Sequence, residues 1–419
     1  MSEILDTASV AFSPLIGLAP LMRRAFANED LKPLGAVLLK RAQENPTDAN
    51  AYLDCSTVLQ LIGQRDAALA MQAQAIEMQA LYSLPAKKEG ASGLKLLVIM
   101  GPGDLMSNTP IEFLVENSDV SLEFLYLTLD SAWPELVPDH DVMLVATAES
   151  DANQALLAQI ALLVEHWPRP VINLPQHIAQ LSRDGVCAAL QQCRGIDMPV
   201  TARADRYALE QLASQQITLE ALLPGDQFPI IVRPTGSHAG TNLEKIETPE
   251  ELHTYLQQVD ADRFYVSRFV DYRNADGLFR KYRIALIEGR AYLCHFAVSS
   301  HWMIHYLNAG MNESAVKRAE EADCMAHFDE TFATRHAAAL QTIDERMQLP
   351  YIGIDCAETQ HGELLIFEID NAMIVHAMDP IDMYPYKKPA MQKVFDAFRQ
   401  LLEHARQTTD ASSVTQAGA

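Results

Sequence analysis

The stretch GIDCAETQHGELLIFEIDN, residues 353–371, places three carboxylates in two apolar runs joined by a polar His-Gly turn. Asp355 lies in the first run, and Glu368 and Asp370 lie two apart in the second. Side chains alternate along a strand, so Glu368 and Asp370 share a face. Carboxylates in apolar strands need counter-charges, which magnesium, Arg or Lys can supply. The stretch predicts a hairpin whose three acids bind magnesium, since hard oxygen ligands suit that ion; a structural ion-pair network is the alternative.

Three cations lie within four positions of the run Phe279-Arg-Lys-Tyr-Arg-Ile284. Alternation sends Lys281 and Arg283 to the same face of the expected strand. The chain of 419 residues has 32 Lys and Arg against 55 Asp and Glu, a formal net charge of −23. A local concentration of cations in such an acidic protein indicates an anion site, although a solvated strand end gives the same pattern.

A glycine-rich loop follows another expected strand at residues 231–242, IVRPTGSHAGTN. The strand delivers Arg233, and the loop carries Gly236, Ser237 and Gly240. Glycines allow backbone N–H groups to approach phosphate oxygens, and the cation offsets their charge. Gly-Ser turns also join ordinary hairpins, so the loop alone is a weak indication.

The chain from residue 199 onward mixes β-rich apolar runs with helical patterns, which predicts an α+β region of roughly 200 residues. We expect strands at residues 228–232, 264–270, 282–287, 291–298 and 364–369, and helices at 249–258, 314–328 and 331–347.

Residues 94–198 predict a small parallel α/β unit. Apolar runs at 96–100, 141–146 and 170–173 are separated by helical patterns, notably at 153–165, which is typical of a parallel sheet. The Gly101-Pro-Gly103 turn is not a dinucleotide fingerprint, because Met106 occupies the third glycine position. We expect a turn into a helix capped near Asn108 or Thr109, with Pro110 in its first turn.

The N-terminal 86 residues are rich in Ala, Leu and Gln at helical spacing. Residues 50–79 match the large and small positions of a tetratricopeptide helix pair with a turn at Gly63, and 31–46 could belong to a degenerate earlier repeat. An ordinary helical hairpin is the alternative. The positions that carry the match are Tyr52, Ser56, Leu59, Ala68 and Ala75.

The order of these elements resembles the ATP-grasp superfamily, which includes D-alanine:D-alanine ligase and glutathione synthetase. The resemblance covers residues 94–405 and implies an α+β chain with four parts. These are a tetratricopeptide-like helical domain at 1–86, a pre-ATP-grasp α/β domain at 94–198, an ATP-grasp domain at 199–405 and a disordered tail at 406–419.

The resemblance also assigns site residues. It implies that Lys281 and Arg283 are catalytic and face the γ-phosphate, and that residues 265–271 form a hinge against the adenine. Arg233 stands where the family has Lys, and Asp370 where it has Asn; Asn371 points to the other face. The implied nucleotide-binding residues are Arg203, Arg233, Gly236, Ser237, Gly240, Arg268, Phe269, Val270 and Asp271, and the implied magnesium ligands are Asp355, Glu368 and Asp370.

The activity implied is an ATP-dependent carboxylate-amine ligase that works through an acyl phosphate, with ATP and Mg²⁺ as cofactors. A kinase on the same fold and a non-catalytic nucleotide-binding interaction protein are the alternatives. Residues 295–308 and 376–386 are dense in His, Trp and Tyr, and we expect them to line the substrate pocket. The candidates are His301, Trp302, His305, Asn308 and His376. His301 and His305 have the spacing of a metal pair on a helix, but without a third nearby ligand packing or hydrogen-bonding histidines are the preferred interpretation.

Composition bounds the partners and the compartment. The negative charge argues against nucleic acid and anionic membrane. The six cysteines form no CxxC pair, and we find neither a basic leader nor an apolar run of about 18 residues. We therefore expect a cytoplasmic protein. The resemblance implies that its partners are ATP and a small-molecule, peptide or protein substrate bearing a carboxylate or amine. A homo-oligomer stays open.

Overall fold

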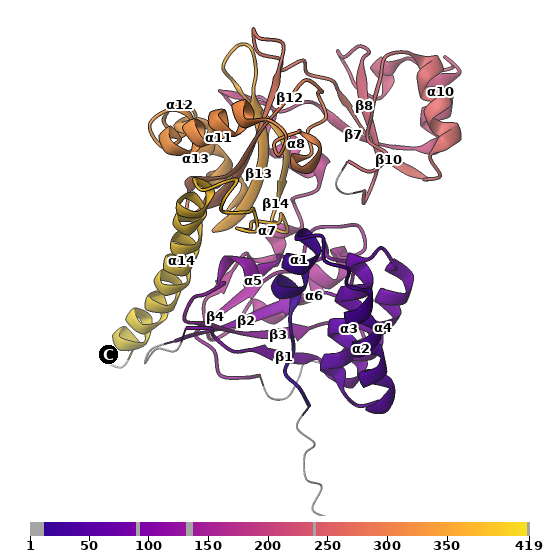
Figure 1. Ribbon diagram of the computed structural model, residues 1–419. Coiled ribbons are helices and arrows are strands. Elements are labelled where there is room, and N and C mark those ends of the chain that lie inside the picture. Colours follow the sequence, from indigo (N-terminus) through magenta and orange to yellow (C-terminus); the bar gives the residue numbers. More distant parts are fainter. Residues whose placement is uncertain (1–11, 89–92, 131–136, 238–239, 417–419) are drawn as a thin grey trace, which may run out of the picture.

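The computed structural model describes residues 12–88, 93–130, 137–237 and 240–416, with side chains through Thr408 (Figure 1). The chain is α+β, as expected, and contains three sheets. One sheet lies with the N-terminal helices in the lower half of Figure 1, and the other two form the upper half. The long C-terminal helix α14 runs along one side of both halves.

Four helices open the described chain, and the last two form the hairpin that the sequence predicts. Gly63 occupies the turn between them with a φ of 79°, a conformation that favours glycine. Ala68 and Ala75 are fully buried, so the helices approach closely at these small residues. Assignment to the tetratricopeptide family stays a prediction. The helices are α1 (Leu18–Phe26), α2 (Lys32–Glu44), α3 (Ala49–Leu61) and α4 (Arg65–Met78).

The first sheet has the order β1-β3-β2-β4-β5, with β2 to β5 parallel and β1 antiparallel to β3. The three expected strands are confirmed as β2, β4 and β5. Two strands were missed: β3, and β1 at the end of the segment expected to be helical. The strands are β1 (Leu81–Leu84), β2 (Leu94–Met100), β3 (Val120–Tyr126), β4 (Val142–Val145) and β5 (Val171–Ile172).

The N-terminal helices and this sheet share one hydrophobic core. Leu53, Ala75 and Tyr82 pack in the same cluster as Leu96 and Phe124. The described residues 12–86 are therefore joined to the α/β unit by buried side chains as well as by β1. The accompanying helices are α5 (Ile111–Leu114), α6 (Gln154–Val164), α7 (Pro175–Ile178) and α8 (Arg183–Leu190); α6 is the helix expected at 153–165.

The start of α5 differs from the expectation. Pro110 is the residue before the helix rather than part of its first turn, and no side chain caps it. Asn108 instead accepts from Gly101 N and donates to Gly101 O, both at 2.8 Å. The Thr109 hydroxyl donates to Asn371 O at 2.9 Å. Both polar side chains satisfy distant backbone groups, which a local capping pattern does not reveal.

The second sheet is antiparallel with the order β7-β10-β8-β9, and its own apolar cluster packs it against two helices. Thr248 caps α10 by accepting from Glu251 N. The elements are β7 (Thr201–Asp205), α9 (Arg206–Ala213), η1 (Leu219–Ala221), β8 (Ile230–Pro234), β9 (Glu244–Ile246), α10 (Pro249–Gln258) and β10 (Arg263–Arg268).

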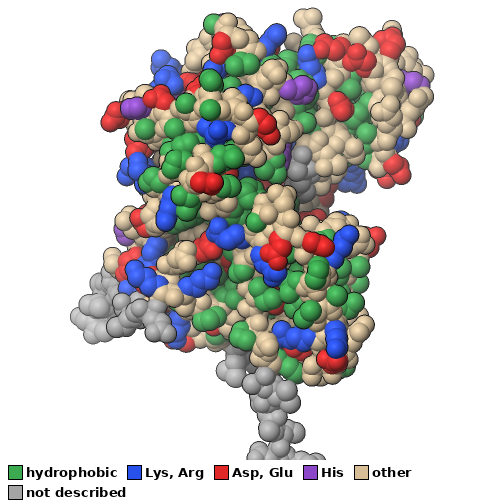
Figure 2. Space-filling view, viewed as in Figure 1, with side chains coloured by type: hydrophobic (Ala, Val, Ile, Leu, Met, Phe, Trp, Pro, Cys, Tyr) green, Lys and Arg blue, Asp and Glu red, His purple; other side chains and the backbone are tan. Residues whose placement is uncertain are grey.

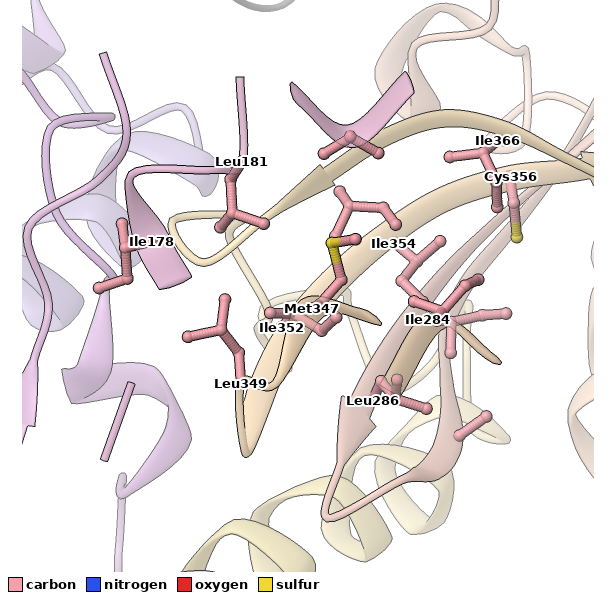
Figure 3. Packing of buried hydrophobic residues seen from close by; sticks show 14 of the residues in the cluster. Ile178, Leu181, Ile284, Leu286, Met347, Leu349, Ile352, Ile354, Cys356 and Ile366 are labelled. Carbon is pink, nitrogen blue, oxygen red and sulfur yellow. The ribbon is translucent and has the colours of Figure 1, made fainter. Parts of the chain in front are cut away.

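The third sheet has the order β12-β11-β13-β14-β6. Ile284, Leu286, Ile352 and Ile354 project from it into a buried cluster that also takes Ile178 and Leu181 from the region of α7 (Figure 3). The helix expected at 331–347 is interrupted at His336. The elements are β6 (Ile196–Asp197), β11 (Phe279–Ile287), β12 (Arg290–Ser299), η2 (Tyr306–Asn308), α11 (Ala315–His327), α12 (Phe332–Arg335), α13 (Ala337–Met347), β13 (Tyr351–Glu358) and β14 (Leu364–Asp370).

The C-terminal helix α14 (Lys387–Gln416) continues through most of the tail that the sequence predicts to be disordered. Side-chain pairs on its surface support the helix near residue 406. Arg406 donates to Glu403 at 2.6 Å, and Gln407 also donates to Glu403, at 3.1 Å. Residues 417–419 of that expected tail lie outside the described residues.

The surface and the thiols agree with the compositional analysis. Acidic and basic side chains are interspersed over the face in Figure 2. All six cysteines are free, and four of them are buried. None of the helices in the described ranges has both the length and the apolar character needed to cross a membrane.

Candidate functional site

A row of charged side chains crosses the third sheet. Arg283 on β11 lies opposite Asp355 on β13, and Asp355 lies opposite Glu368 on β14. Residues directly opposite on antiparallel strands share a face, so the three side chains converge. Arg283 donates to Asp355 from Nε at 2.8 Å and from Nη2 at 2.9 Å, and Lys281 Nζ lies 2.6 Å from Asp355 Oδ2. The predicted common face of Lys281 and Arg283 is confirmed.

Asp355 is 2% exposed, and its ionisation depends on these two cations. Burial raises its pKa, but the charges of Arg283 and Lys281 outweigh burial and hold the pKa well below its usual range. Arg283 and Lys281 therefore supply the counter-charge that we expected for Asp355. In this structure Asp355 belongs to an ion-pair network, which was the alternative to magnesium binding.

Glu368 and Asp370 have different environments although they share a face of β14. Arg183 forms an ion pair with Glu368 and donates to Phe367 O at 3.0 Å. Burial raises the pKa of Glu368, but the charges of Arg183 and Arg233 outweigh burial, so the pKa lies below its usual value. Asp370 accepts from Ala372 N at 2.9 Å, and burial together with Glu368 raises its pKa to about 7. No Lys or Arg of the described chain forms an ion pair with Asp370.

The three predicted magnesium ligands have different partners. Within the described residues, no set of three or more His, Cys, Asp or Glu side chains is arranged to hold a metal ion. Asp355 is turned to Arg283 and Lys281, and its assignment as a magnesium ligand stays a prediction. Glu368 and Asp370 do fit magnesium, because a nucleotide-bound Mg²⁺ keeps several waters and takes one or two carboxylates. Asp370 has the uncompensated charge that such an ion would offset.

A second row crosses the second sheet. Arg203 on β7 and Arg233 on β8 lie on either side of Tyr265 on β10. Arg233 is 7% exposed and donates to Ser237 Oγ at 3.1 Å; burial and Arg183 lower its pKa to about 10. Helix α8 links the two rows, because its Arg183 forms an ion pair with Glu368 of the first row and its Asp184 accepts from Arg203 of the second row at 2.9 Å.

The glycine loop extends the second row. Gly236 and Gly240 have φ values of 70° and 74°, so both adopt the left-handed conformation that suits glycine. A side-chain carbon at Gly240 would lie 3.3 Å from Met303 Sδ. The end of the loop therefore meets the segment that was expected to line the substrate pocket. Residues 238–239 of the loop lie outside the described residues.

Two of the predicted nucleotide-binding arginines are engaged by carboxylates. Arg203 donates to Asp184 at 2.9 Å and to Asp151 at 2.6 Å. Arg268 forms an ion pair with Asp197, which joins β10 to β6. These contacts lie far apart in sequence, so the cation pattern alone does not predict them.

The rest of the expected hinge packs against the expected substrate segment. The Phe269 ring makes an edge contact with Trp302, with centroids 5.7 Å apart, and Lys245 Nζ lies 4.3 Å from the Phe269 ring. Val270 packs in the same small cluster as Trp302. Asp271 accepts from Arg273 Nε at 2.9 Å, so this carboxylate is paired locally.

His301 and His305 have the packing and hydrogen-bonding contacts that the sequence analysis favours over a metal pair. His301 and His305 do not lie on a helix, so their spacing of four does not bring them to one face. His301 stacks on Trp302, and His305 N donates to Asn308 Oδ1 at 3.0 Å. His376 lies apart from these residues, with its ring 5.0 Å from His295 and 5.4 Å from Phe26 of α1. Burial lowers the pKa of His376 to about 3.

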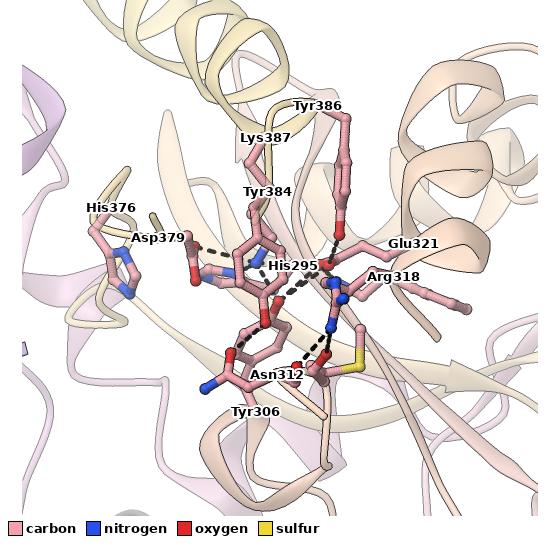
Figure 4. A network of polar contacts seen from close by, with 12 residues as sticks. His295, Tyr306, Asn312, Arg318, Glu321, His376, Asp379, Tyr384, Tyr386 and Lys387 are labelled. Carbon is pink, nitrogen blue, oxygen red and sulfur yellow. Dashed lines mark hydrogen bonds and ion pairs between the residues drawn. The ribbon is translucent and has the colours of Figure 1, made fainter. Parts of the chain in front are cut away.

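A buried network joins the two His- and Tyr-rich segments (Figure 4). Lys387, 3% exposed, lies 3.3 Å from Glu321 and 3.1 Å from Asp379. Glu321 accepts from the hydroxyls of Tyr306 at 3.0 Å and Tyr386 at 2.7 Å. The sequence analysis singled out the two segments but not Glu321 or Lys387. These residues lie on α11 and α14, whose sequences carry no motif that indicates a site.

This network reaches the charged row through His295. His295 on β12 lies opposite Arg283 on β11, and Lys387 Nζ lies 3.4 Å from His295 Nδ1. Burial and Lys387 lower the pKa of His295 well below its usual value, so its imidazole is neutral. Arg183 was also missed by the sequence analysis, because a single cation at the start of α8 has no local pattern.

Comparisons with known proteins add the following. No protein-family model and no curated protein matches the chain. Among solved structures, the chain is similar to the VanG D-Ala:D-Ser ligase from Enterococcus faecalis, at 12% identity over 74% of this chain and 100% of that one, with a TM-score of 0.47.

It is also similar to a D-alanine–D-alanine ligase from Bacillus anthracis complexed with ATP, at 14% identity over 75% of this chain and 99% of that one, with a TM-score of 0.43. A RimK domain ATP-grasp protein from Sphaerobacter thermophilus matches at 13% identity over 72% and 98%, with a TM-score of 0.41. These TM-scores lie below 0.5, so we base the function on the side chains of the two rows.

Proposed function

We propose that this protein is an ATP-dependent carboxylate-amine ligase of the ATP-grasp superfamily, which forms an amide through an acyl phosphate in the cytoplasm. The observation that carries the proposal is the pair of rows that α8 links, Arg203-Tyr265-Arg233 and Arg283-Asp355-Glu368, on two different sheets. Phosphate binding accounts for this concentration of cations in a protein of net charge −23.

Each row has a distinct part in nucleotide binding. Arg233 and Arg183 would contact phosphate oxygens, with Gly236, Ser237 and Gly240 offering backbone N–H groups from the loop. Arg replaces the family's Lys at 233, which keeps the charge and allows a bidentate contact. Phe269 and the hinge would flank the adenine. Tyr265 separates the two cations of its row and offers a ring face, over which the Arg203 guanidinium lies at 5.1 Å.

The charged row of the third sheet would act on the phosphoryl group that is transferred. Lys281 and Arg283 offset the charge that develops on its oxygens, and Asp355 holds both cations in place. Glu368 and Asp370 would hold magnesium, which supplies further charge neutralisation at the nucleotide phosphates. In that arrangement Arg183, which is paired with Glu368 in this structure, would contact the phosphates.

The chemistry follows from these contacts. A carboxylate oxygen of the substrate attacks the γ-phosphorus and ADP leaves, which gives an acyl phosphate. An amine nitrogen then attacks the acyl carbon, phosphate leaves, and the nitrogen loses a proton to give the amide. We propose that His301, Trp302, His305 and Asn308 line the substrate side of the site, and that His376 takes part from the second segment, where its ring lies 5.0 Å from His295.

Incubation with ATP, magnesium and pooled amino acids or peptides tests the proposal. A ligase releases ADP and phosphate with a new amide, a kinase yields a phosphorylated product, and a non-catalytic binding protein yields neither. Arg283→Met should reduce amide formation at least a hundredfold. Arg280→Met is the matched control, because Arg280 lies on the opposite face of β11 and pairs with Asp276 and Glu320. Equal turnover by the two variants would refute the assignment of Arg283.

A further inference from the structure

A cavity of about 70 Å³ lies where α1, α3 and α4 meet the end of β2 and the start of α5. Its walls carry three carboxylates and the amide of Gln60. Asp104 is paired with Arg65 at 3.2 Å, which leaves the two carboxylates Asp54 and Glu112 without a cation. Apolar side chains such as Leu53, Leu105 and Phe124 cover much of the rest. No Lys, Arg or His is among the described residues that line it.

The two carboxylates anchor the start of α1. Glu112 accepts from Leu18 N and Ala19 N, both at 2.8 Å. Asp54 accepts from Ile16 N at 2.9 Å and from Gly17 N at 3.1 Å. These donors belong to the first backbone N–H groups of a helix, which have no partner within it. Backbone N–H groups thus satisfy part of each carboxylate's hydrogen-bonding capacity, but they bring no full positive charge.

The negative charge in the cavity is uncompensated. Neither carboxylate forms an ion pair with a described Lys, Arg or His. Burial raises the pKa of Asp54 to about 6 and that of Glu112 to about 7, and the charge of Asp54 adds to the shift of Glu112. Arg41 and Lys87 act on them from outside the lining and offset little of this. A cation inside the cavity would relieve both groups at once.

Gln60 provides a separate indication of a missing donor. Its Oε1 is buried and has no hydrogen-bond partner among the described residues. Buried acceptors are nearly always paired, so an unpaired one in a cavity wall points to a donor that belongs there. Gln72 and Asn108, the other two amides of the wall, are both bonded to backbone, at Gly103 and Gly101.

We propose that this cavity binds a short primary ammonium compound. The ammonium N–H groups donate to Gln60 Oε1 and to free lone pairs of Glu112 and Asp54, and the alkyl part contacts Leu53, Leu105 and Phe124. The volume corresponds to about five waters, hence to a ligand of about five non-hydrogen atoms. Water could also donate to Gln60, but it would leave the negative charge of both carboxylates uncompensated. The inference does not depend on the proposed ligase activity.

The test is calorimetric titration of the full chain, without nucleotide, with butylammonium, 1-butanol and butyrate. We expect saturable binding of butylammonium alone, because only this probe has both the charge and the alkyl body. Binding of 1-butanol with equal affinity would show that charge is not recognised and would overturn the proposal. Absence of butylammonium binding up to millimolar concentration would mean that the cavity holds water only, and would also overturn it.

Gln60→Met sharpens the test, because affinity and stability should not fall together. Removing an unpaired acceptor should leave the melting temperature unchanged or higher, while butylammonium affinity falls at least tenfold. Gln64→Met is the matched control: Gln64 is exposed on the same hairpin outside the cavity, and its variant should bind like the wild type. Glu112→Gln gives a second route and should also lose at least tenfold in affinity. Wild-type affinity in both cavity variants would refute the site.

Discussion

Asp355 and Glu112 are both buried carboxylates, yet their pKa values shift in opposite directions. Burial raises the pKa in each case, but Asp355 has Arg283 and Lys281 as partners and stays below its usual range. Glu112 accepts only from backbone N–H groups, and its pKa rises to about 7. A compensating charge, rather than depth of burial, therefore decides whether a carboxylate in this fold is ionised.

Asp370 falls between the two cases and lies on β14 two residues from Glu368 of the charged row. Its pKa is raised to about 7, and it has no cation partner of its own. The same reasoning that separates Asp355 from Glu112 marks Asp370 and the cavity under α1 as places where an external cation would fit.

The largest expected loss of stability comes from Asp355, the carboxylate whose charge is compensated. Asp355→Asn leaves Arg283 and Lys281 without their carboxylate, and the loss of one partner of a buried ion pair costs about 3–5 kcal/mol. Urea unfolding measures it. Asp276→Asn removes the exposed partner of Arg280 and should cost far less. Similar losses in the two variants would show that the buried row is not a stabilising network.

A somewhat smaller effect is expected in the second compensated network. Lys387→Met leaves the fully buried Glu321 without a cation, at a cost of about 3 kcal/mol. The loss should lie at the lower end because the Tyr306 and Tyr386 hydroxyls still donate to Glu321. The double variant with Glu321→Gln should be less destabilised than the sum of the single ones; additive losses would mean that the two residues are not coupled.

Crowding beside Asp370 gives the next effect. Gly353 pairs with Asp370 across the hairpin, and a side-chain carbon there would lie 2.8 Å from Met373 Cβ and Sδ. Gly353→Ala should therefore cost about 1–3 kcal/mol, measured by thermal unfolding. Adding Met373→Ala removes the Sδ contact but keeps the Cβ contact, so it should restore only part of the loss. A Gly353→Ala variant as stable as the wild type would mean that the strand shifts freely.

The smallest expected effect concerns the uncompensated side. The folded pKa of Glu112 is raised from 4.5 to about 7, so its contribution to stability is full at acid pH and is lost as the pH rises through 7. Between pH 6 and 8 this loss amounts to about 1 kcal/mol. The free energy of unfolding of Glu112→Gln should fall less steeply over that interval than that of the wild type. Parallel pH profiles would contradict the raised pKa.

Local patterns predicted the elements that carry the site. Apolar runs and the His-Gly turn gave β13 and β14, and alternation gave the common face of Lys281 and Arg283. Missed strands had mixed signals: β3 alternates with Ser121 and Glu123, and β1 directly follows a long helix. Pairings between distant segments could not be read from spacing, because Arg183 with Glu368 and Arg268 with Asp197 depend on how three sheets pack.

The most direct test of the central claim is calorimetric titration of the wild-type chain with ATP in the presence and absence of magnesium. If the two rows form one nucleotide site, ATP binds with an affinity that rises with magnesium, Arg233→Met loses at least tenfold of it, and Arg280→Met keeps it. Absence of magnesium-dependent ATP binding, or unchanged affinity in Arg233→Met, would contradict the account.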